Sequence, residues 1–126
     1  MRDMTKVIFF ADTYALIELA IGSQAYKQYL NALLVTTQYN LAELYYHFLR
    51  TYGVEAADSY YERYAPSAIL VSDTSIREGM KLKLASKKEK LSYADCIGYA
   101  LAQELGIKFL TGDQKFEDKD NVEFVK

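Results

Sequence analysis

The chain has 126 residues, of which 51% are hydrophobic and 25% charged, and its formal net charge is -2. This length predicts a single domain, residues 1–126, that buries a core without disulfides, and the charge excludes nucleic-acid binding through an overall basic surface. The single cysteine, Cys96, excludes an intramolecular disulfide and an all-cysteine zinc site. No apolar run is long enough for a signal-peptide core or a membrane span, so we expect a cytoplasmic protein.

Strands and helices alternate in the first half of the chain. A β-branched and aromatic run at 6–11 predicts a buried strand, which Asp12 follows directly. Asn40 and Glu43 have the spacing of a capping box at the start of a helix. The predicted elements are a strand at 6–11, helices at 14–21 and 24–30, a strand at 33–37, and a helix from Asn40 to about Tyr52 that stops at Gly53.

The second half of the chain continues this alternation. Ser92 can cap a helix whose third residue is Asp95, and Gly106 can end that helix. The next apolar run predicts a strand that stops at Thr111-Gly112-Asp113. The predicted elements are a helix at 54–64, a strand at 68–71, a helix at 74–86, the helix after Ser92, a strand at 107–111, and an edge strand at 122–125.

The alternation predicts the fold class. Parallel neighbouring strands need long crossover connections, and helical crossovers cover the faces of the sheet. We therefore predict an α/β protein, a three-layer α/β/α sandwich with a central parallel sheet of four or five strands.

Four acids lie at element ends that a parallel sheet brings to one edge. Asp12 follows the first strand, and Glu43 lies in the first turn of the helix after the second strand. Asp95 lies in the first turn of the helix before the strand at 107–111, and Asp113 follows that strand. Ligands bind at the carboxyl ends of such strands. Because converging carboxylates need a counter-charge, and Mg²⁺ or Mn²⁺ prefers oxygen ligands, the four acids predict a divalent metal site.

A short motif surrounds each acid, and the four motifs span almost the whole chain. They are Phe9-Phe10-Ala11-Asp12-Thr13, Asn40-Leu41-Ala42-Glu43-Leu44, Tyr93-Ala94-Asp95-Cys96-Ile97 and Phe109-Leu110-Thr111-Gly112-Asp113-Gln114-Lys115-Phe116. In order and spacing this set resembles the PIN domain, a small α/β/α family of metal-dependent ribonucleases that includes the toxins of VapBC-type toxin-antitoxin pairs.

The resemblance implies a function and a set of site residues. It implies an endoribonuclease with Mg²⁺ or Mn²⁺ as cofactor, in which Asp12, Asp95 and Asp113 hold one or two ions. Glu43 would complete a second metal site through water or orient the attacking water, and Thr111 would hydrogen-bond a ligand or a metal-bound water. It also implies a toxin with an RNA substrate, an antitoxin peptide or protein as partner, and a homodimer.

Several alternatives stay open on the sequence alone. Each acid taken singly could serve only to cap a helix or form a turn. A haloacid-dehalogenase-like phosphatase needs a second aspartate two residues after Asp12, where this chain has Tyr14, and a receiver domain needs paired acids at that strand end. Within the PIN family, the alternatives are a degenerate domain that binds RNA or protein without catalysis, and a non-toxin RNA-processing nuclease.

Two further groups of residues stand out. The basic cluster consists of Lys81, Lys83, Lys87, Lys88 and Lys90. These lysines either stabilise the C-terminal end of a helix or contact RNA phosphates. Tyrosines are frequent in the helices at 40–52 and 54–64, which predicts packing between these helices and, for a minority, an interface with a partner.

Overall fold

The computed structural model describes residues 7–126, so the first residue of the predicted strand at 6–11 lies outside the described residues. Four parallel strands form the sheet: β1 (Ile8–Ala11), β2 (Leu33–Val35), β3 (Lys108–Thr111) and β4 (Val122–Phe124). Their order is β2-β1-β3-β4. The predicted parallel sheet is confirmed, with four strands and with β4 at an edge.

Helices connect these strands, and their ends follow local sequence signals. Ser92 accepts a hydrogen bond from the Asp95 N–H at 3.0 Å and caps its helix, which Gly106 ends with a φ of 70°. Across residues 7–126, no helix is both long and apolar enough to cross a membrane. The helices are α1 (Thr13–Ala20), α2 (Gln38–Tyr52), α3 (Val54–Tyr64), α4 (Asp73–Ala85) and α5 (Tyr93–Leu105), with 3-10 helices η1 (Gln24–Tyr29), η2 (Ala65–Ser67), η3 (Lys87–Glu89) and η4 (Gln114–Phe116).

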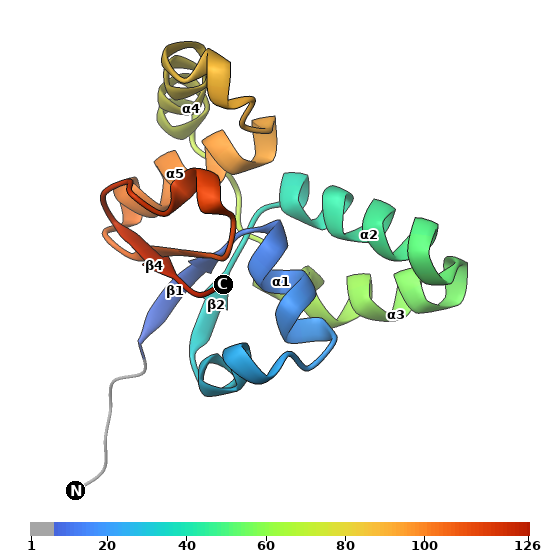
Figure 1. Ribbon diagram of the computed structural model, residues 1–126. Helices are drawn as coiled ribbons and strands as arrows, with labels where there is room; N and C mark the ends of the chain where they lie inside the picture. The colour runs from blue at the N-terminus through green and yellow to red at the C-terminus, as the bar shows by residue number, and fades with distance from the viewer. Residues whose placement is uncertain (1–6) are drawn as a thin grey trace, which may run out of the picture.

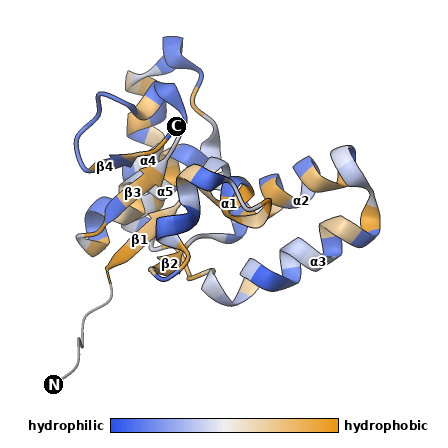
Figure 2. Ribbon diagram, turned by 60° about the horizontal axis from the view of Figure 1, so that its bottom comes forward, coloured by the Kyte–Doolittle hydropathy of each residue, from blue (hydrophilic) through white to orange (hydrophobic). Residues whose placement is uncertain are grey.

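Alternate side chains of the strands enter two separate hydrophobic clusters. Phe9 and Ala11 of β1 pack with Leu110 and with residues of α1, α2 and α3 on one face of the sheet. Phe10 and Phe109 point to the other face, where their rings stack at 5.6 Å and pack with residues of α5. Helices therefore lie on both sides of the hydrophobic strands (Figures 1 and 2), which confirms the three-layer α/β/α sandwich.

Two pairs of helices project from the sheet, and we call them the α2–α3 arm (38–64) and the α4–α5 arm (73–105). Figure 1 shows the end of β1 between them. Gly53 joins α2 to α3 with a φ of 97°, a backbone conformation that favours glycine. The start of α2 and the start of α5 lie at the same end of the sheet as the loop after β1.

Tyrosine hydroxyls tie the last strand of the domain to an early segment. The Tyr26 hydroxyl donates a hydrogen bond to the Val125 carbonyl at 2.5 Å, and the Tyr29 hydroxyl donates to the Glu123 carboxylate at 2.6 Å. Both tyrosines are buried in η1. These contacts attach the C-terminal segment to η1, which lies almost a hundred positions earlier in the chain.

The predicted strand at 68–71 is wrong. Ala68 makes only an isolated parallel bridge with Thr36. On the Thr36 side of this bridge, the backbone turns into α2 at Gln38. Within the described chain, residues 69–71 therefore have no extended neighbouring backbone with which to pair. Leu70 is 96% exposed, which is not the environment of a buried strand.

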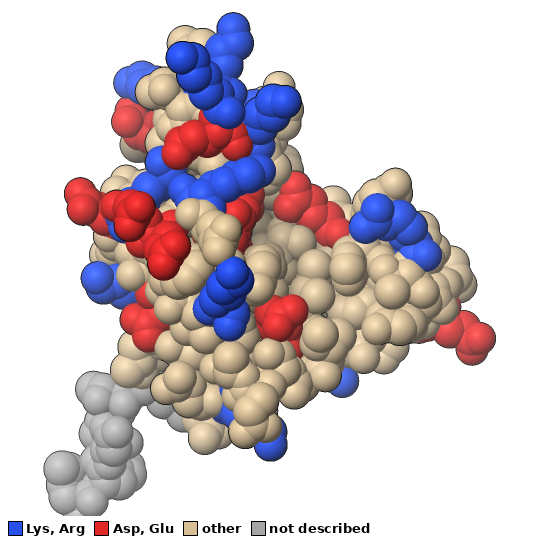
Figure 3. All heavy atoms as spheres, viewed as in Figure 1, with Lys and Arg blue, Asp and Glu red and all other residues tan. Residues whose placement is uncertain are grey.

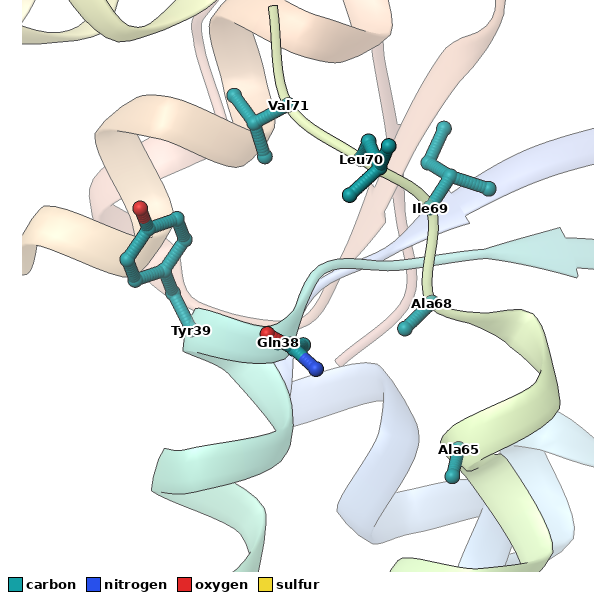
Figure 4. Close-up of a pocket in the computed structure, with 7 residues that line it drawn as sticks. All are labelled: Gln38, Tyr39, Ala65, Ala68, Ile69, Leu70 and Val71. Carbon is teal, nitrogen blue, oxygen red and sulfur yellow. The ribbon is translucent and has the colours of Figure 1, made fainter.

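This segment instead borders a hollow of about 390 Å³. Figure 4 shows the hollow between Gln38 and Tyr39 at the start of α2 and the segment 68–71. None of the four predicted acids lines it. It is therefore separate from the predicted metal site.

The start of α2 also differs from the prediction. The helix begins at Gln38, and its cap is Thr37, whose hydroxyl oxygen accepts a hydrogen bond from the Asn40 N–H at 3.2 Å. Asn40 is buried inside the helix rather than at its cap, because the threonine three residues earlier already satisfies the free N–H. Glu43 consequently lies in the second turn of α2, not the first.

Gly79 sets how closely the two helices of the α4–α5 arm approach. A Cβ atom at this position would lie 2.9 Å from the Ile97 Cα and 3.0 Å from the Cys96 carbonyl oxygen. Because these are backbone atoms, they cannot move aside without shifting α5.

We predict that Gly79→Ala lowers the free energy of unfolding by about 1–2 kcal/mol, although alanine favours helix formation. Urea titration would measure this change. Ser59→Ala, at an exposed position of α3, is the matched control and should be neutral or stabilising. A Gly79→Ala variant as stable as the wild type would contradict the close approach of the two helices.

Candidate functional site

Asp12 is a buried carboxylate held at the end of β1. One carboxylate oxygen accepts a hydrogen bond from the Ala15 N–H at 2.8 Å and caps α1, and the other accepts from the Thr111 hydroxyl at 2.5 Å. Burial raises the pKa of Asp12 well above its usual range, the charge of Asp95 raises it further, and the two hydrogen bonds lower it. Among the described residues, no positively charged side chain contributes to this shift of the Asp12 pKa.

Thr111 and Asp113 follow each other at the end of β3. The Thr111 side chain is fully buried, and its hydroxyl accepts a hydrogen bond from the Asp113 N–H at 3.0 Å while donating to Asp12. The Asp113 carboxylate accepts from the Lys115 N–H at 3.0 Å and caps η4. Thr111 thus links the ends of β1 and β3.

Asp95 lies in the first turn of α5. Burial raises its pKa to about 7, and the charges of Glu43 and Asp113 act in the same direction. The hydrogen bond to Ser92 and the charge of Lys115 lower it. Asp95 therefore lies within electrostatic range of acids from two other elements.

Glu43 is oriented by a chain of side-chain hydrogen bonds. The Thr13 hydroxyl donates to a Glu43 carboxylate oxygen at 2.7 Å, and the Asn40 amide donates to the same Thr13 hydroxyl oxygen at 3.2 Å. The Thr37 hydroxyl in turn donates to the Asn40 side-chain oxygen at 2.7 Å. Because Thr13 follows Asp12, this chain fixes Glu43 relative to the end of β1.

The roles of Thr13 and Asn40 were missed by the sequence analysis. Thr13 was noted only as the neighbour of Asp12, and Asn40 only as a helix cap. Their spacing gives a partial signal, since Asn40 and Glu43 are three residues apart on one helix and lie on the same side of it.

The four predicted acids form one electrostatic cluster, because Asp12 and Asp95 each respond to the charge of Asp113, and Asp95 also responds to that of Glu43. Acidic atoms are visible in the hollow between the two arms (Figure 3). In the described part of the chain, no three acidic, histidine or cysteine side chains already stand in metal-binding geometry. Mg²⁺ commonly binds through one or two carboxylates and keeps several waters, so this all-oxygen cluster suits a hard divalent cation.

Solved structures of similar fold include proteins that are described as toxins or as members of toxin-antitoxin systems. VapC20 from Mycobacterium tuberculosis, described as a sarcin-ricin loop cleaving toxin, has a TM-score of 0.74 and 18% identity, over 94% of this chain and 99% of that chain. VapBC2 from Rickettsia felis, bound to a DNA fragment from its promoter, has a TM-score of 0.72 and 17% identity, over 95% and 100%. VapBC-5 from Mycobacterium tuberculosis has a TM-score of 0.67 and 19% identity, over 95% and 98%.

At these identities, the likeness to solved structures establishes the fold. No curated protein matches the chain. The family model for the PIN domain matches residues 9–122, which covers β1 and the start of β4 and includes all four acids. The chain therefore belongs to the PIN domain family.

Proposed function

We propose that the protein is a metal-dependent endoribonuclease that hydrolyses RNA phosphodiesters, and that it is the toxin of a VapBC-type pair. The observation that carries this proposal is the burial of Asp12 beside the charge of Asp95, with no cation from residues 7–126 among the groups that shift the pKa of Asp12. Two such carboxylates are ionised together at neutral pH only with a counter-charge, which Mg²⁺ or Mn²⁺ supplies.

Each predicted residue has a role in this proposal. Asp12, Asp95 and Asp113 would hold one or two divalent cations through carboxylate oxygens. When bound, a divalent cation lowers the pKa of water and stabilises negative charge on the phosphate and the leaving oxygen. Glu43, held by Thr13, would orient the attacking water or complete a second cation site. Thr111 keeps the Asp12 carboxylate in place through its hydroxyl.

The hydrogen-bond networks favour catalysis over a degenerate domain that only binds RNA or protein. Thr111 holds Asp12, and Thr13 holds Glu43, so two of the acids from different elements are oriented before any ligand arrives. Such preorganisation of acidic side chains lowers the barrier of a hydrolytic step and therefore supports catalysis.

Partners are proposed from the neighbours and from the α2–α3 arm. Two of the similar structures are described as VapBC proteins, which supports an antitoxin partner. Tyr46, Leu49 and Tyr52 are exposed and spaced three residues apart on α2, so they offer an apolar stripe to a partner. We propose that an antitoxin segment or a second copy of this chain covers this stripe.

Asp95→Asn should lower Mn²⁺-dependent RNA cleavage by about a hundredfold or more, because it removes one carboxylate ligand without changing the side-chain shape. Cleavage of a long RNA by purified protein would measure this. Asp118→Asn, an exposed acid outside the site, is the matched control and should cleave as the wild type does. Equal cleavage by wild type and Asp95→Asn would refute the proposed reaction.

The metal-free protein should lose stability as the pH rises from about 4 to about 7. In this range the folded state binds more protons than the unfolded state, since the folded pKa of Asp95 is about 7 and that of Asp12 is also raised, whereas unfolded aspartates titrate near pH 4. The contribution of the protonated Asp12 and Asp95 to the free energy of unfolding is therefore fully present below about pH 4 and is lost as the pH rises through about 7.

Thermal melts of the metal-free protein test this dependence. Asp95→Asn resembles the protonated acid at every pH, so its melting temperature should exceed that of the wild type by several degrees at pH 8 and by little at pH 4. Added Mn²⁺ should raise the melting temperature of the wild type more at pH 8 than at pH 5. A constant difference between the two proteins would contradict the raised pKa.

Toxin function is tested by expression in a bacterial host. Induction of the wild-type chain should halt growth, and Asp95→Asn should remove the effect. Co-expression of a small neighbouring open reading frame should restore growth by supplying the antitoxin. Normal growth together with RNA cleavage in vitro would point to a non-toxin RNA-processing nuclease instead.

A further inference from the structure

A second hollow, of about 300 Å³, lies on the α4–α5 arm. Apolar side chains line part of it, among them Leu84, which is 74% exposed, and Tyr93, which is 63% exposed. The rest of its lining is basic and consists of Lys83, Lys87 and Lys90. We call this site the lysine–tyrosine hollow. An apolar wall beside positive charges suits a ligand that carries both a flat ring and an anionic group.

The lysines at this hollow are free to bind an anion. Lys87 and Lys90, which line the hollow, and Lys88, which follows Lys87 in η3, are exposed, and no carboxylate of residues 7–126 lies within ion-pair distance of them. The paired lysines nearby are different ones: Lys81 binds Glu78, and Lys119 binds Glu89. Figure 3 shows lysine and arginine atoms gathered over the arm that carries α4.

Lys83 positions the tyrosine ring rather than the ligand. Its ammonium group lies 4.5 Å from the centre of the Tyr93 ring and donates a hydrogen bond to the Leu91 carbonyl at 2.6 Å. The contact fixes one side of the ring. Most of the Tyr93 side chain is nevertheless open to solvent, so a planar group can stack on it.

Lys90 adopts a conformation that glycine or asparagine would adopt more easily. Its φ is 56°, in the left-handed region. Its carbonyl accepts a hydrogen bond from the Lys115 ammonium group at 3.4 Å, and the charge of Lys115 lowers the pKa of Asp95. Lys115 therefore connects the lysine–tyrosine hollow to the acid cluster.

We propose that the lysine–tyrosine hollow binds an unpaired nucleotide of the RNA substrate, next to the phosphodiester that the acids cleave. This inference rests on the proposed nuclease function. Tyr93 stacks on the base, and Lys87, Lys88 and Lys90 bind the adjoining phosphates. Tyr93 and Asp95 share the first turn of α5, so a strand that crosses this end of the helix passes from the hollow to the acids.

In this proposal, the nucleotide that enters the lysine–tyrosine hollow is unpaired. In a duplex, the base faces are stacked and unavailable to an aromatic side chain, whereas an unpaired base can turn outward onto the ring. An acidic protein segment would match the lysines equally well. Binding of an acidic protein segment would not depend on stacking with the exposed ring of Tyr93. This difference distinguishes the two ligands.

The test measures RNA binding without cleavage. Asp95→Asn protein, in the presence of a chelator, would be titrated into a labelled single-stranded RNA of about twelve nucleotides and into a hairpin of the same length. Tyr93→Ala should weaken binding of the single strand about tenfold or more, and Tyr93→Phe should restore it, since phenylalanine keeps the stacking face.

The lysines are tested through the salt dependence of binding. Replacing Lys87 and Lys88 together by glutamine should reduce the slope of log affinity against log salt by about 1.4, because each phosphate contact to a single strand contributes about 0.7. Lys90→Gly should weaken binding while leaving the melting temperature unchanged or raised, since glycine adopts the same φ without strain. The double variant Lys27→Gln, Lys108→Gln removes the same charge elsewhere and should bind as the parent does.

The outcomes separate this inference from the proposed function. If the variants at the hollow bind the single strand like the control, the hollow is not an RNA site and the inference fails, whether or not the wild type cleaves RNA. If polyglutamate displaces the RNA and Tyr93→Ala changes nothing, the hollow binds acidic protein and the inference also fails. Weaker binding by the Tyr93 and lysine variants supports RNA binding at the lysine–tyrosine hollow. This holds even if the wild type, tested separately with Mn²⁺, shows no cleavage.

Discussion

The constraint on which the candidate site depends is the electrostatic repulsion between carboxylates that the fold holds at one end of the sheet. Asp12 is buried at the end of β1, and the charge of Asp95 at the start of α5 raises the cost of ionising it. Folding brings these carboxylates together because the parallel sheet and the hydrophobic clusters on its two faces place the ends of β1 and β3 beside the start of α5. When a fold holds like charges this close together, a counter-ion is needed to ionise all of them at neutral pH.

The network around the acids is built mostly from short hydroxyl side chains. Thr111 donates to Asp12, and Thr13 donates to Glu43, so each carboxylate is oriented by a neutral group. A neutral donor fixes the position of an oxygen without cancelling its charge, whereas a lysine or arginine would fill the role that a cation is proposed to take. The neutral hydroxyl donors therefore leave the negative charge of the acids available to a cation, as the proposed function requires.

Much of the fold followed from the sequence because its signals are local. Ser92 and Gly106 mark the ends of α5, and the alternation of apolar runs with helices identified the parallel sheet. The segment at 68–71 has the composition of a strand, but pairing depends on whether a partner backbone is present, and that is a property of the whole fold. Asn40 was misplaced because Thr37 competes for the same cap.

The candidate site was predictable only at the level of its acids. Their positions at element ends indicate one edge of a sheet, but the side chain that Thr13 orients and the ring that Lys83 covers depend on contacts between distant segments. Sequence spacing places Asn40 and Glu43 on one side of a helix but does not show which side chain of a distant segment they meet. The structure supplied these contacts and the lysine–tyrosine hollow on the α4–α5 arm.

The hydrogen bond between Thr111 and Asp12 joins residues 99 positions apart, and the one between Tyr26 and Val125 spans the same separation. On the ribosome, the first strand emerges long before the segments that complete its surroundings. The acids of this domain can thus assemble only after nearly all of it has left the exit tunnel. A partly synthesised chain would therefore lack the assembled cluster of acids on which the proposed function rests.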